Sequence, residues 1–232
     1  MSSGSDSQKP RDWLLSSLRK KGILRSKSVE EAFLSVRRED FLWNREEVAL
    51  AYLDEPLQLG RTGQTISAPH MVVMMLEELE LHQGMRVLEV GAGSGYSAAL
   101  IAHIVSRNQR APQKLVVALE QNAILADFAS RNIERVALDE WVDVIHADGS
   151  LGFPAGKDEE IYDRIVVAAA APQIPYFSKR QLKSGGILEM PVGGHLVQSL
   201  TKLNKIGHKD EAEYKQRKIV SCTFVPLIKS RK

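Results

Sequence analysis

Short apolar runs alternate with stretches of helical periodicity through the middle of the chain, between Met85 and Val192. Runs of mostly β-branched residues are typical of buried strands, and apolar residues spaced three or four apart are typical of amphipathic helices. This pattern predicts strands at 86–90, 115–119, 142–146, 165–170 and 187–192, with helices at 94–105, 123–136 and 174–182. Such alternation favours an α/β fold with a doubly wound, mainly parallel sheet.

The two ends of the chain follow other patterns. Apolar residues at helical spacing between 11 and 22, with Gly22 as a stop, predict helices ahead of the sheet. Residues 196–203 and 218–228 look like strands, and the stretch between them is polar and shows no helical pattern. Strands joined without a helical crossover are antiparallel, so we expect an antiparallel pair at one edge of the sheet.

Composition excludes several classes of protein. The 232 residues suffice for one sizeable domain, and the formal net charge of +2 is too small to indicate a polyanion as partner. No apolar run approaches the ~20 residues that cross a bilayer. Residues 1–10 are polar and Ser-rich, which predicts a disordered tail rather than a secretory signal. The single cysteine, Cys222, fits a reducing compartment. We therefore expect a cytoplasmic protein that binds neither nucleic acid nor membrane. We also expect a monomer, but no feature of the sequence reveals the oligomeric state.

Three glycines, Gly91, Gly93 and Gly95, directly follow the first predicted strand of the sheet. Glycine permits positive φ and a close approach of ligand to backbone, and the helix beyond offers free N–H groups. The spacing is not that of a dinucleotide fingerprint, which would need glycine at Tyr96, nor that of a P-loop. The turn resembles that of Rossmann-like S-adenosylmethionine-dependent methyltransferases.

Three acids surround this turn. Glu120 ends the second strand, where a carboxylate can accept both ribose hydroxyls, and Glu89 can bind the methionine ammonium or orient the turn. Asp148 lies where methyltransferases typically hold the adenine amino group. Any one acid could instead be a helix cap or lie in a solvated loop, but the combination predicts an S-adenosylmethionine site. Its predicted residues are Glu89, Gly91, Gly93, Gly95, Glu120, Asp148 and Gly149, with Gln64 and Thr65 from an earlier loop.

That earlier loop, residues 63–71, reads Gly-Gln-Thr-Ile-Ser-Ala-Pro-His-Met. Pro69 suits a first helical turn and Ser67 lies where an N-cap belongs, so capping alone could explain the serine. The run is denser than a cap requires, however, and it resembles the signature of protein-L-isoaspartate (D-aspartate) O-methyltransferases, especially archaeal-type members. The resemblance covers about residues 20–228 and includes, in the same order, segments 23–26, 54–57, 88–95, 148–150, 169–172, 181–186, 191–193 and 225–227.

The resemblance implies a protein-repair enzyme. Such enzymes transfer a methyl group from S-adenosylmethionine to the α-carboxylate of L-isoaspartyl residues in damaged proteins. The ester then loses methanol to give a succinimide, which hydrolyses partly to aspartate. We expect one domain over residues 11–232, with an N-terminal helical layer and substrate loop at 11–84, a cofactor-binding core at 85–192 and C-terminal strands at 193–232.

Ser67 is the predicted catalytic residue. A carboxylate of pKa near ~4 is already ionised, so the enzyme needs no strong base and chiefly has to align the reacting atoms. We expect the Ser67 hydroxyl to donate to the substrate carboxylate. His70 either borders the site or merely packs and caps the helix, and no metal ligand is predicted. The remaining predicted substrate-binding residues are Ile66 and Ala68, mainly through their backbone, and Val225, Pro226 and Leu227 on the last strand.

Three positions, Val72, Ala168 and Ile228, depart from residues that some members of the family carry, and we expect them to affect affinity and substrate preference rather than reaction class. Two rival functions remain open at this level. One is a methyltransferase of the same fold with another acceptor, although the motif typical of base amino-group methylation is missing. The other is a non-catalytic adaptor that binds the cofactor.

Overall fold

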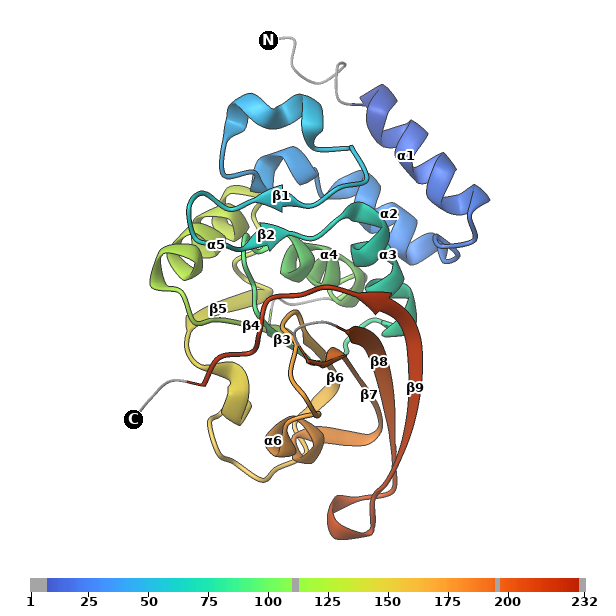
Figure 1. Ribbon diagram of the computed structural model, residues 1–232, viewed down its shortest axis with the longest axis vertical. Coiled ribbons are helices and arrows are strands. Elements are labelled where there is room, and N and C mark those ends of the chain that lie inside the picture. Colours follow the sequence, from blue (N-terminus) through green and yellow to red (C-terminus); the bar gives the residue numbers. More distant parts are fainter. Residues whose placement is uncertain (1–7, 110–112, 195–196, 230–232) are drawn as a thin grey trace.

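A seven-stranded sheet forms the centre of the computed structural model, which describes residues 8–109, 113–194 and 197–229 (Figure 1). The strand order is β5-β4-β3-β6-β7-β8-β9, in which β3 to β7 run parallel and the last two strands are antiparallel. This arrangement confirms the predicted fold class. The strands are β3 (Val87–Val90), β4 (Val116–Glu120), β5 (Val142–His146), β6 (Tyr162–Val167), β7 (Leu182–Gly193), β8 (Gln198–Ile206) and β9 (Glu213–Cys222).

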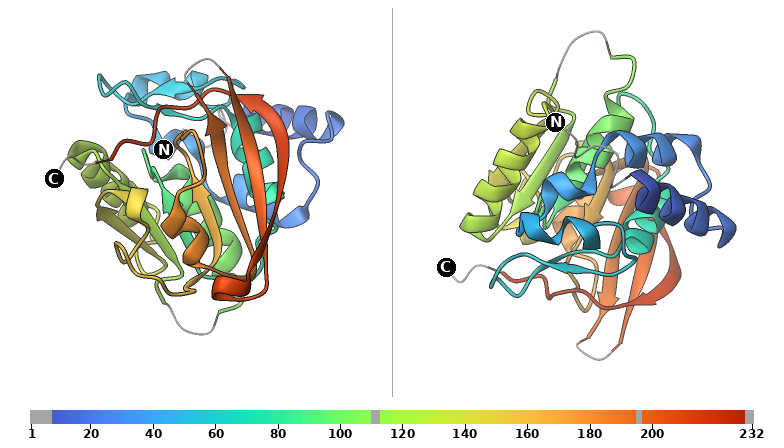
Figure 2. Two further views of the ribbon diagram at one scale, coloured as in Figure 1. Left: turned by 60° about the horizontal axis from the view of Figure 1, so that its bottom comes forward. Right: turned by 90° about the horizontal axis from the view of Figure 1, so that it is seen from above.

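Helices cover both faces of the sheet, because the chain winds in two directions from β3. On one face α4 (Tyr96–Val105) and α5 (Ala123–Arg135) pack against alternate strand residues such as Val87 and Val116. The N-terminal helices extend that layer, with α1 at the periphery of the molecule (Figure 2). They are α1 (Gln8–Lys20), α2 (Lys27–Ser35), α3 (Pro69–Glu78) and the 3-10 segments η1 (Arg38–Phe41) and η2 (Arg45–Leu50). The opposite face carries α6 (Tyr176–Arg180) and η3 (Gly149–Leu151), and η4 (Lys209–Glu211) lies between β8 and β9.

A small hairpin precedes α3 and lies next to the glycine turn. Its strands, β1 (Leu57–Gln58) and β2 (Thr65–Ile66), pair antiparallel. Leu59 follows β1 and lies next to the glycine turn. A Cβ atom added to Gly93 would be 3.4 Å from Cδ1 of Leu59. The predicted substrate loop therefore lies directly on the predicted cofactor turn.

The last strand ends earlier than its apolar residues predict. β9 stops at Cys222, and the chain beyond it crosses the sheet with a single parallel bridge between Pro226 and Ala170. Pro226 has no N–H group to donate to a neighbouring strand. The backbone N–H and C=O of Phe224 bond to the side chain of Gln198 instead of to a strand. The prediction of a strand over 218–228 that includes 225–227 is therefore wrong.

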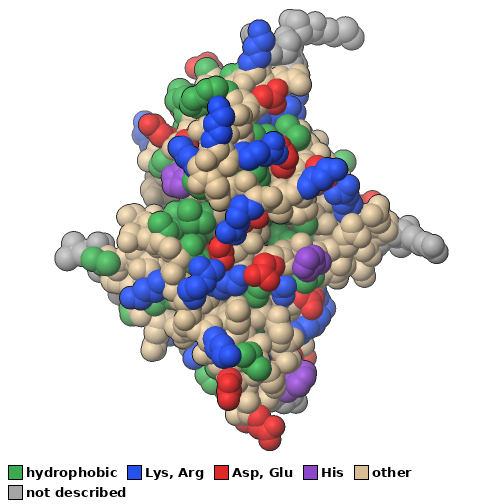
Figure 3. Space-filling view, turned by 90° about the vertical axis from the view of Figure 1, so that its right-hand side faces the viewer, with side chains coloured by type: hydrophobic (Ala, Val, Ile, Leu, Met, Phe, Trp, Pro, Cys, Tyr) green, Lys and Arg blue, Asp and Glu red, His purple; other side chains and the backbone are tan. Residues whose placement is uncertain are grey.

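The sequence pattern does not predict residues 213–217 of β9 as strand, because most of them are polar. Lys215, Arg217 and Lys218 are exposed along this edge strand, on a face rich in Lys and Arg side chains (Figure 3). Charged residues on a sheet edge discourage pairing with other chains, so their position has a physical reason.

Two further boundaries differ from the prediction. Helix α6 is short, and the glycine-containing residues 183–186 lie inside β7, where strand pairing skips from Leu182 to Ile187. Helix α1 begins at Gln8, so residues 8–10 belong to it, whereas the rest of the predicted tail lies outside the described residues. Among the described residues, no helix is long and apolar enough to span a bilayer.

Candidate active site

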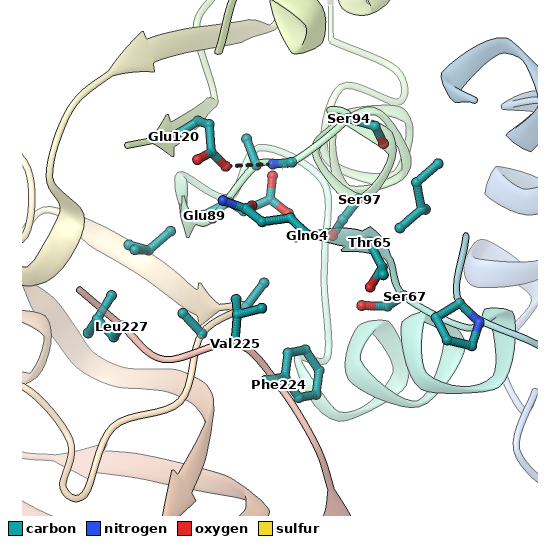
Figure 4. Close-up of a pocket in the computed structure, with 18 of the residues that line it drawn as sticks. Gln64, Thr65, Ser67, Glu89, Ser94, Ser97, Glu120, Phe224, Val225 and Leu227 are labelled. Atoms are coloured by element: carbon teal, nitrogen blue, oxygen red, sulfur yellow. Dashed lines mark hydrogen bonds between the residues drawn. The ribbon is translucent and has the colours of Figure 1, made fainter. Parts of the chain in front are cut away.

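A cavity of about 730 Å³ opens at the carboxyl ends of the parallel strands, where open α/β sheets typically bind ligands. Its walls are the glycine turn, the β1–β2 hairpin with the start of α3, and the chain beyond β9 (Figure 4). Two of the predicted site residues, Gly95 and Asp148, are not among those that line it. The predicted residues that do are Gln64, Thr65, Ile66, Ser67, Ala68, His70, Glu89, Gly91, Gly93, Glu120, Gly149, Val225, Pro226 and Leu227.

The glycine turn has a backbone that only glycine adopts without strain. Gly91, Gly93 and Gly95 have φ values of +93°, +56° and +82°. Gly95 is also the residue before α4, and a Cβ there would lie 3.3 Å from the carbonyl oxygen of Ala129. Gly95 therefore supports the turn through packing rather than by lining the cavity.

Glu120 fixes this turn to the end of β4. Gly93 N donates to its Oε2 at 2.9 Å, and Asn122 N donates to its Oε1 at 2.9 Å. Each carboxylate oxygen can accept a second hydrogen bond, so Glu120 can still receive ribose hydroxyls while it holds the turn. The contact with ribose stays a prediction.

Glu89 is the most perturbed acid of the cavity. Strand alternation points its side chain toward α4, where the Ser97 hydroxyl hydrogen-bonds to it. Burial raises the pKa of Glu89 to about 8, partly offset by that hydrogen bond and reinforced by the negative charge of Glu120. Its Oε2 atom has no hydrogen-bond partner among the described residues. A buried carboxyl oriented in this way fits the ammonium group of a cationic ligand.

Ser67 does not cap a helix. Ala68 is the N-cap of α3 and provides no side-chain cap, so the capping explanation for Ser67 is wrong. Burial alternates along β2, with Thr65 exposed, Ile66 buried and Ser67 partly exposed. The side chains of Thr65 and Ser67 consequently lie on the same side of the cavity, and Gln64 extends into it from the same hairpin (Figure 4).

Asp148 acts in the structure as a local cap. Its Oδ1 accepts a hydrogen bond from Ser150 N at 2.8 Å at the start of η3. Its neighbour Gly149 packs so closely on β3 that a Cβ would lie 2.4 Å from Cγ1 of Val90. The contact of Asp148 with adenine stays a prediction, whereas Gly149 has a clear packing reason to be glycine.

Residues 225–227 border the cavity, but their backbone is partly engaged. Ala170 N donates to Val225 O at 2.8 Å, and Leu227 N donates to Ala170 O at 2.7 Å. These two groups hold the segment against the end of β6. Leu227 N–H therefore cannot also pair with a peptide, whereas Val225 O can accept a second hydrogen bond, so the predicted substrate role is left to this oxygen and the other groups of the segment.

Sequence reasoning missed several residues that line the cavity. Ser97 had a usable signal, because it lies three positions after Ser94 on the helix that begins at the turn. Phe224 had no local signal, because its place depends on the distant Gln198. The three departures from the family pattern, Val72, Ala168 and Ile228, all line the same cavity.

Comparison with known proteins agrees with this geometry. The sequence model of the protein-L-isoaspartate(D-aspartate) O-methyltransferase family matches residues 9–232. A relative of that name from Staphylothermus marinus is 46% identical over 211 residues, which cover 91% of this chain and 90% of the relative. Another from Methanopyrus kandleri is 42% identical over 222 residues, covering 95% and 92%.

Solved structures give the same picture. The enzyme of this class from Plasmodium falciparum, in complex with S-adenosyl-L-homocysteine, superposes with a TM-score of 0.78 at 27% identity, covering 95% of this chain and 99% of that one. A second protein-L-isoaspartate O-methyltransferase gives a TM-score of 0.76 at 30% identity, covering 93% of this chain and 65% of the other. The present chain belongs to the protein-L-isoaspartate (D-aspartate) O-methyltransferase family.

Proposed function

We propose that this chain methylates the α-carboxylate of L-isoaspartyl residues in damaged proteins and peptides, with S-adenosylmethionine as methyl donor. Family membership supports the activity. The observation that carries the residue assignment is the position of Ser67, whose hydroxyl is not used as a helix cap and shares one cavity with the glycine turn and Glu89. The methyl ester is the enzyme's product, and the later return to aspartate is chemistry of the repaired protein itself.

The donor side of the cavity suits S-adenosylmethionine. When bound, this cofactor supplies a methyl group on a positively charged sulfur, which is a good leaving group. Glu89 would hold its ammonium group, because a buried carboxyl without a second partner gains from a cation. Glu120 would hold the ribose, and Gly91 and Gly93 let the backbone approach closely.

The acceptor side has to orient a carboxylate rather than deprotonate it. A carboxylic acid of pKa near ~4 is ionised at neutral pH, so no general base is required. Ser67 donates a hydrogen bond to one carboxylate oxygen and leaves the other directed at the methyl group. Alignment of this kind contributes up to ~7–11 kcal/mol in well-oriented model reactions, so loss of one orienting bond costs only part of it.

Apolar residues close the cavity around the reacting atoms. Phe224 and Val225 line it from the chain beyond β9, and Val72 lines it from α3. Side chains of this kind exclude water from the transferred methyl group. Exclusion of water also strengthens the interactions of Glu89 and Ser67 with charged groups.

The test is methyl transfer to an isoaspartyl peptide, with the aspartyl form of the same peptide as control. We expect methylation of the isoaspartyl form only. Ser67→Ala should lower turnover ~10²-fold while calorimetry shows unchanged affinity for S-adenosylhomocysteine. Thr65→Val, which removes the neighbouring hydroxyl, should lose much less. Wild-type turnover in the Ser67 variant would reject the positioning role, and methylation of both peptide forms would reject the substrate.

The compartment, the oligomeric state and the partners of the protein also belong to the proposal. We infer a cytoplasmic monomer that acts on isoaspartyl proteins and has neither nucleic acid nor membrane as partner. The net charge of +2 supports the absence of a polyanionic partner. The sequence similarity to named repair enzymes supports damaged proteins as substrates.

A further inference from the structure

A carboxylate–imidazole pair lies at the border of the cavity. Asp54 Oδ1 accepts a hydrogen bond from the backbone N–H of His70 at 2.8 Å and lies 2.9 Å from Nδ1 of the same residue. The two residues are sixteen positions apart, so the pair depends on the fold rather than on local sequence. His70 lines the cavity and Asp54 does not, so Asp54 supports His70 from behind.

One of the two bonds has a structural explanation. Helix α3 begins with an N-cap, Ala68, that has no side-chain acceptor. The first N–H groups of a helix need acceptors, and a carboxylate near them is favourable, so Asp54 substitutes for the missing cap. Capping requires only the bond to the backbone of His70. The bond to its ring is additional and needs another reason.

The bond to the ring determines which nitrogen is protonated. An ionised carboxylate only accepts hydrogen bonds, so Nδ1 has to carry a proton to interact with Asp54. In the neutral ring Nε2 is then an acceptor. The His70 side chain is 38% exposed at the cavity, so Nε2 is the polar atom that it can offer to a ligand there.

The pair is also tied to the N-terminal layer by charge. Lys21 Nζ lies 4.0 Å from Asp54 Oδ2, and the buried guanidinium of Arg38 interacts electrostatically with the same carboxylate. Lys21 follows α1 and Arg38 begins η1, so both cations come from the N-terminal layer. Asp54 is thereby held between these cations and the ring of His70.

We propose that Asp54 is a positioning residue for substrate binding, which acts through His70. It fixes the Nδ1-protonated form and the orientation of the ring, so that Nε2 accepts a hydrogen bond from a backbone N–H of the isoaspartyl peptide. This inference rests on the proposed function for its substrate. It adds a residue that does not touch substrate itself, and it explains why residues 54–57 and 63–71 have to meet in space.

A double-mutant cycle separates the two roles of Asp54. Asp54→Ala removes both bonds, but in a His70→Ala background only the capping bond remains to be lost, because residue 70 keeps its backbone N–H. We expect Asp54→Ala to raise KM for an isoaspartyl peptide about 10-fold, with turnover and affinity for S-adenosylhomocysteine nearly unchanged. In the His70→Ala background the same substitution should leave KM unchanged. Asp54→Asn, which keeps an acceptor oxygen, should restore part of the loss.

Ser26→Ala is the matched control, because Ser26 caps α2 through a bond from Val29 N, donates to Glu77 Oε1 and is not among the residues that line the cavity. It should lower the melting temperature as Asp54→Ala does, without a change in KM. An equal rise in KM in both His70 backgrounds, or no rise in either, would overturn the proposal.

A second readout does not depend on activity. Nitrogen-15 NMR of the histidine ring should show His70 protonated at Nδ1 in the wild type and a shifted tautomer equilibrium in Asp54→Ala. A wild-type ring protonated at Nε2 would overturn the pair even if the enzyme is active. Failure of the wild type to methylate any isoaspartyl peptide would instead reject the proposed function and leave the spectrum to decide on the pair.

Discussion

The proposed donor side and the proposed acceptor side of the cavity are built in different ways. On the donor side Glu120 holds the turn after β3, and the acids Glu89 and Glu120 are only 1% and 3% exposed. On the acceptor side the hairpin residues 64–67, among which only Ile66 is buried, meet His70 and the chain beyond β9, held by a few long-range bonds from Asp54, Gln198 and Ala170. A small donor of fixed shape suits the first construction, and an acceptor within many different proteins suits the second.

The largest expected contrast comes from adding one methyl group on each side. Gly149→Ala forces a Cβ to within 2.4 Å of Val90, whereas Gly63→Ala meets no atom within 4 Å. We expect Gly149→Ala to cost about 1–3 kcal/mol of stability and to weaken binding of S-adenosylhomocysteine by about 30-fold, because the end of β3 has to move.

Gly63→Ala is the matched control on the hairpin. Its φ of +75° makes alanine costly by roughly 1–2 kcal/mol, but the open surroundings let the loop adjust. We expect less than about a 3-fold change in affinity for S-adenosylhomocysteine. Thermal unfolding and calorimetry on both variants test the contrast, and equal losses of affinity would show that the hairpin is as rigid as the core.

A smaller effect should appear in the pH dependence of donor binding. Because burial raises the pKa of Glu89 to about 8, its carboxyl is mostly protonated at pH 6 and ionises as the pH passes 8. A bound ammonium favours the ionised form, so binding releases a proton and tightens as the pH rises. We expect affinity for S-adenosylhomocysteine to increase about 10-fold from pH 6 to 7.5.

Glu89→Gln is the control for this effect, since glutamine keeps the shape and cannot titrate. Its affinity should be lower and nearly independent of pH over the same range. Calorimetry in buffers of different ionisation enthalpy should detect proton release in the wild type alone. Identical pH slopes in the two proteins would assign the titration to another group.

The donor side could be predicted from sequence because its determinants are close together along the chain. The turn at 91–95 and the acid Glu120 each follow a strand that the apolar pattern identifies, and parallel strands bring their carboxyl ends together. The structure adds a local role to two of these residues, and their predicted contacts with the cofactor stay predictions. Gly95 supports the turn without lining the cavity, and Asp148 caps η3.

For the proposed acceptor side, the sequence predicts candidate residues but not how they are arranged in space. The motif singles out Ser67, but the N-cap of α3 is Ala68, and the acceptor for His70 N is Asp54, which no local pattern connects to α3. The path of residues 223–228 depends on Gln198, whose amide bonds both backbone groups of Phe224 in place of a neighbouring strand. The pattern of apolar residues does not reveal hydrogen bonds between segments that are distant in sequence. It therefore predicts a last strand that is too long.

The smallest predicted effect concerns Ile228, which lines the proposed acceptor side at 61% exposure. If this side holds peptides by general apolar contact, Ile228→Gln should raise KM for an isoaspartyl peptide with apolar neighbours about 3-fold and leave donor affinity unchanged. Ile124→Gln on α5 is the matched control, because Ile124 is equally exposed and lies outside the cavity lining. A change in turnover instead of KM would mean that residue 228 reaches the reacting carboxylate, and the acceptor side would then be as closely fitted as the donor side.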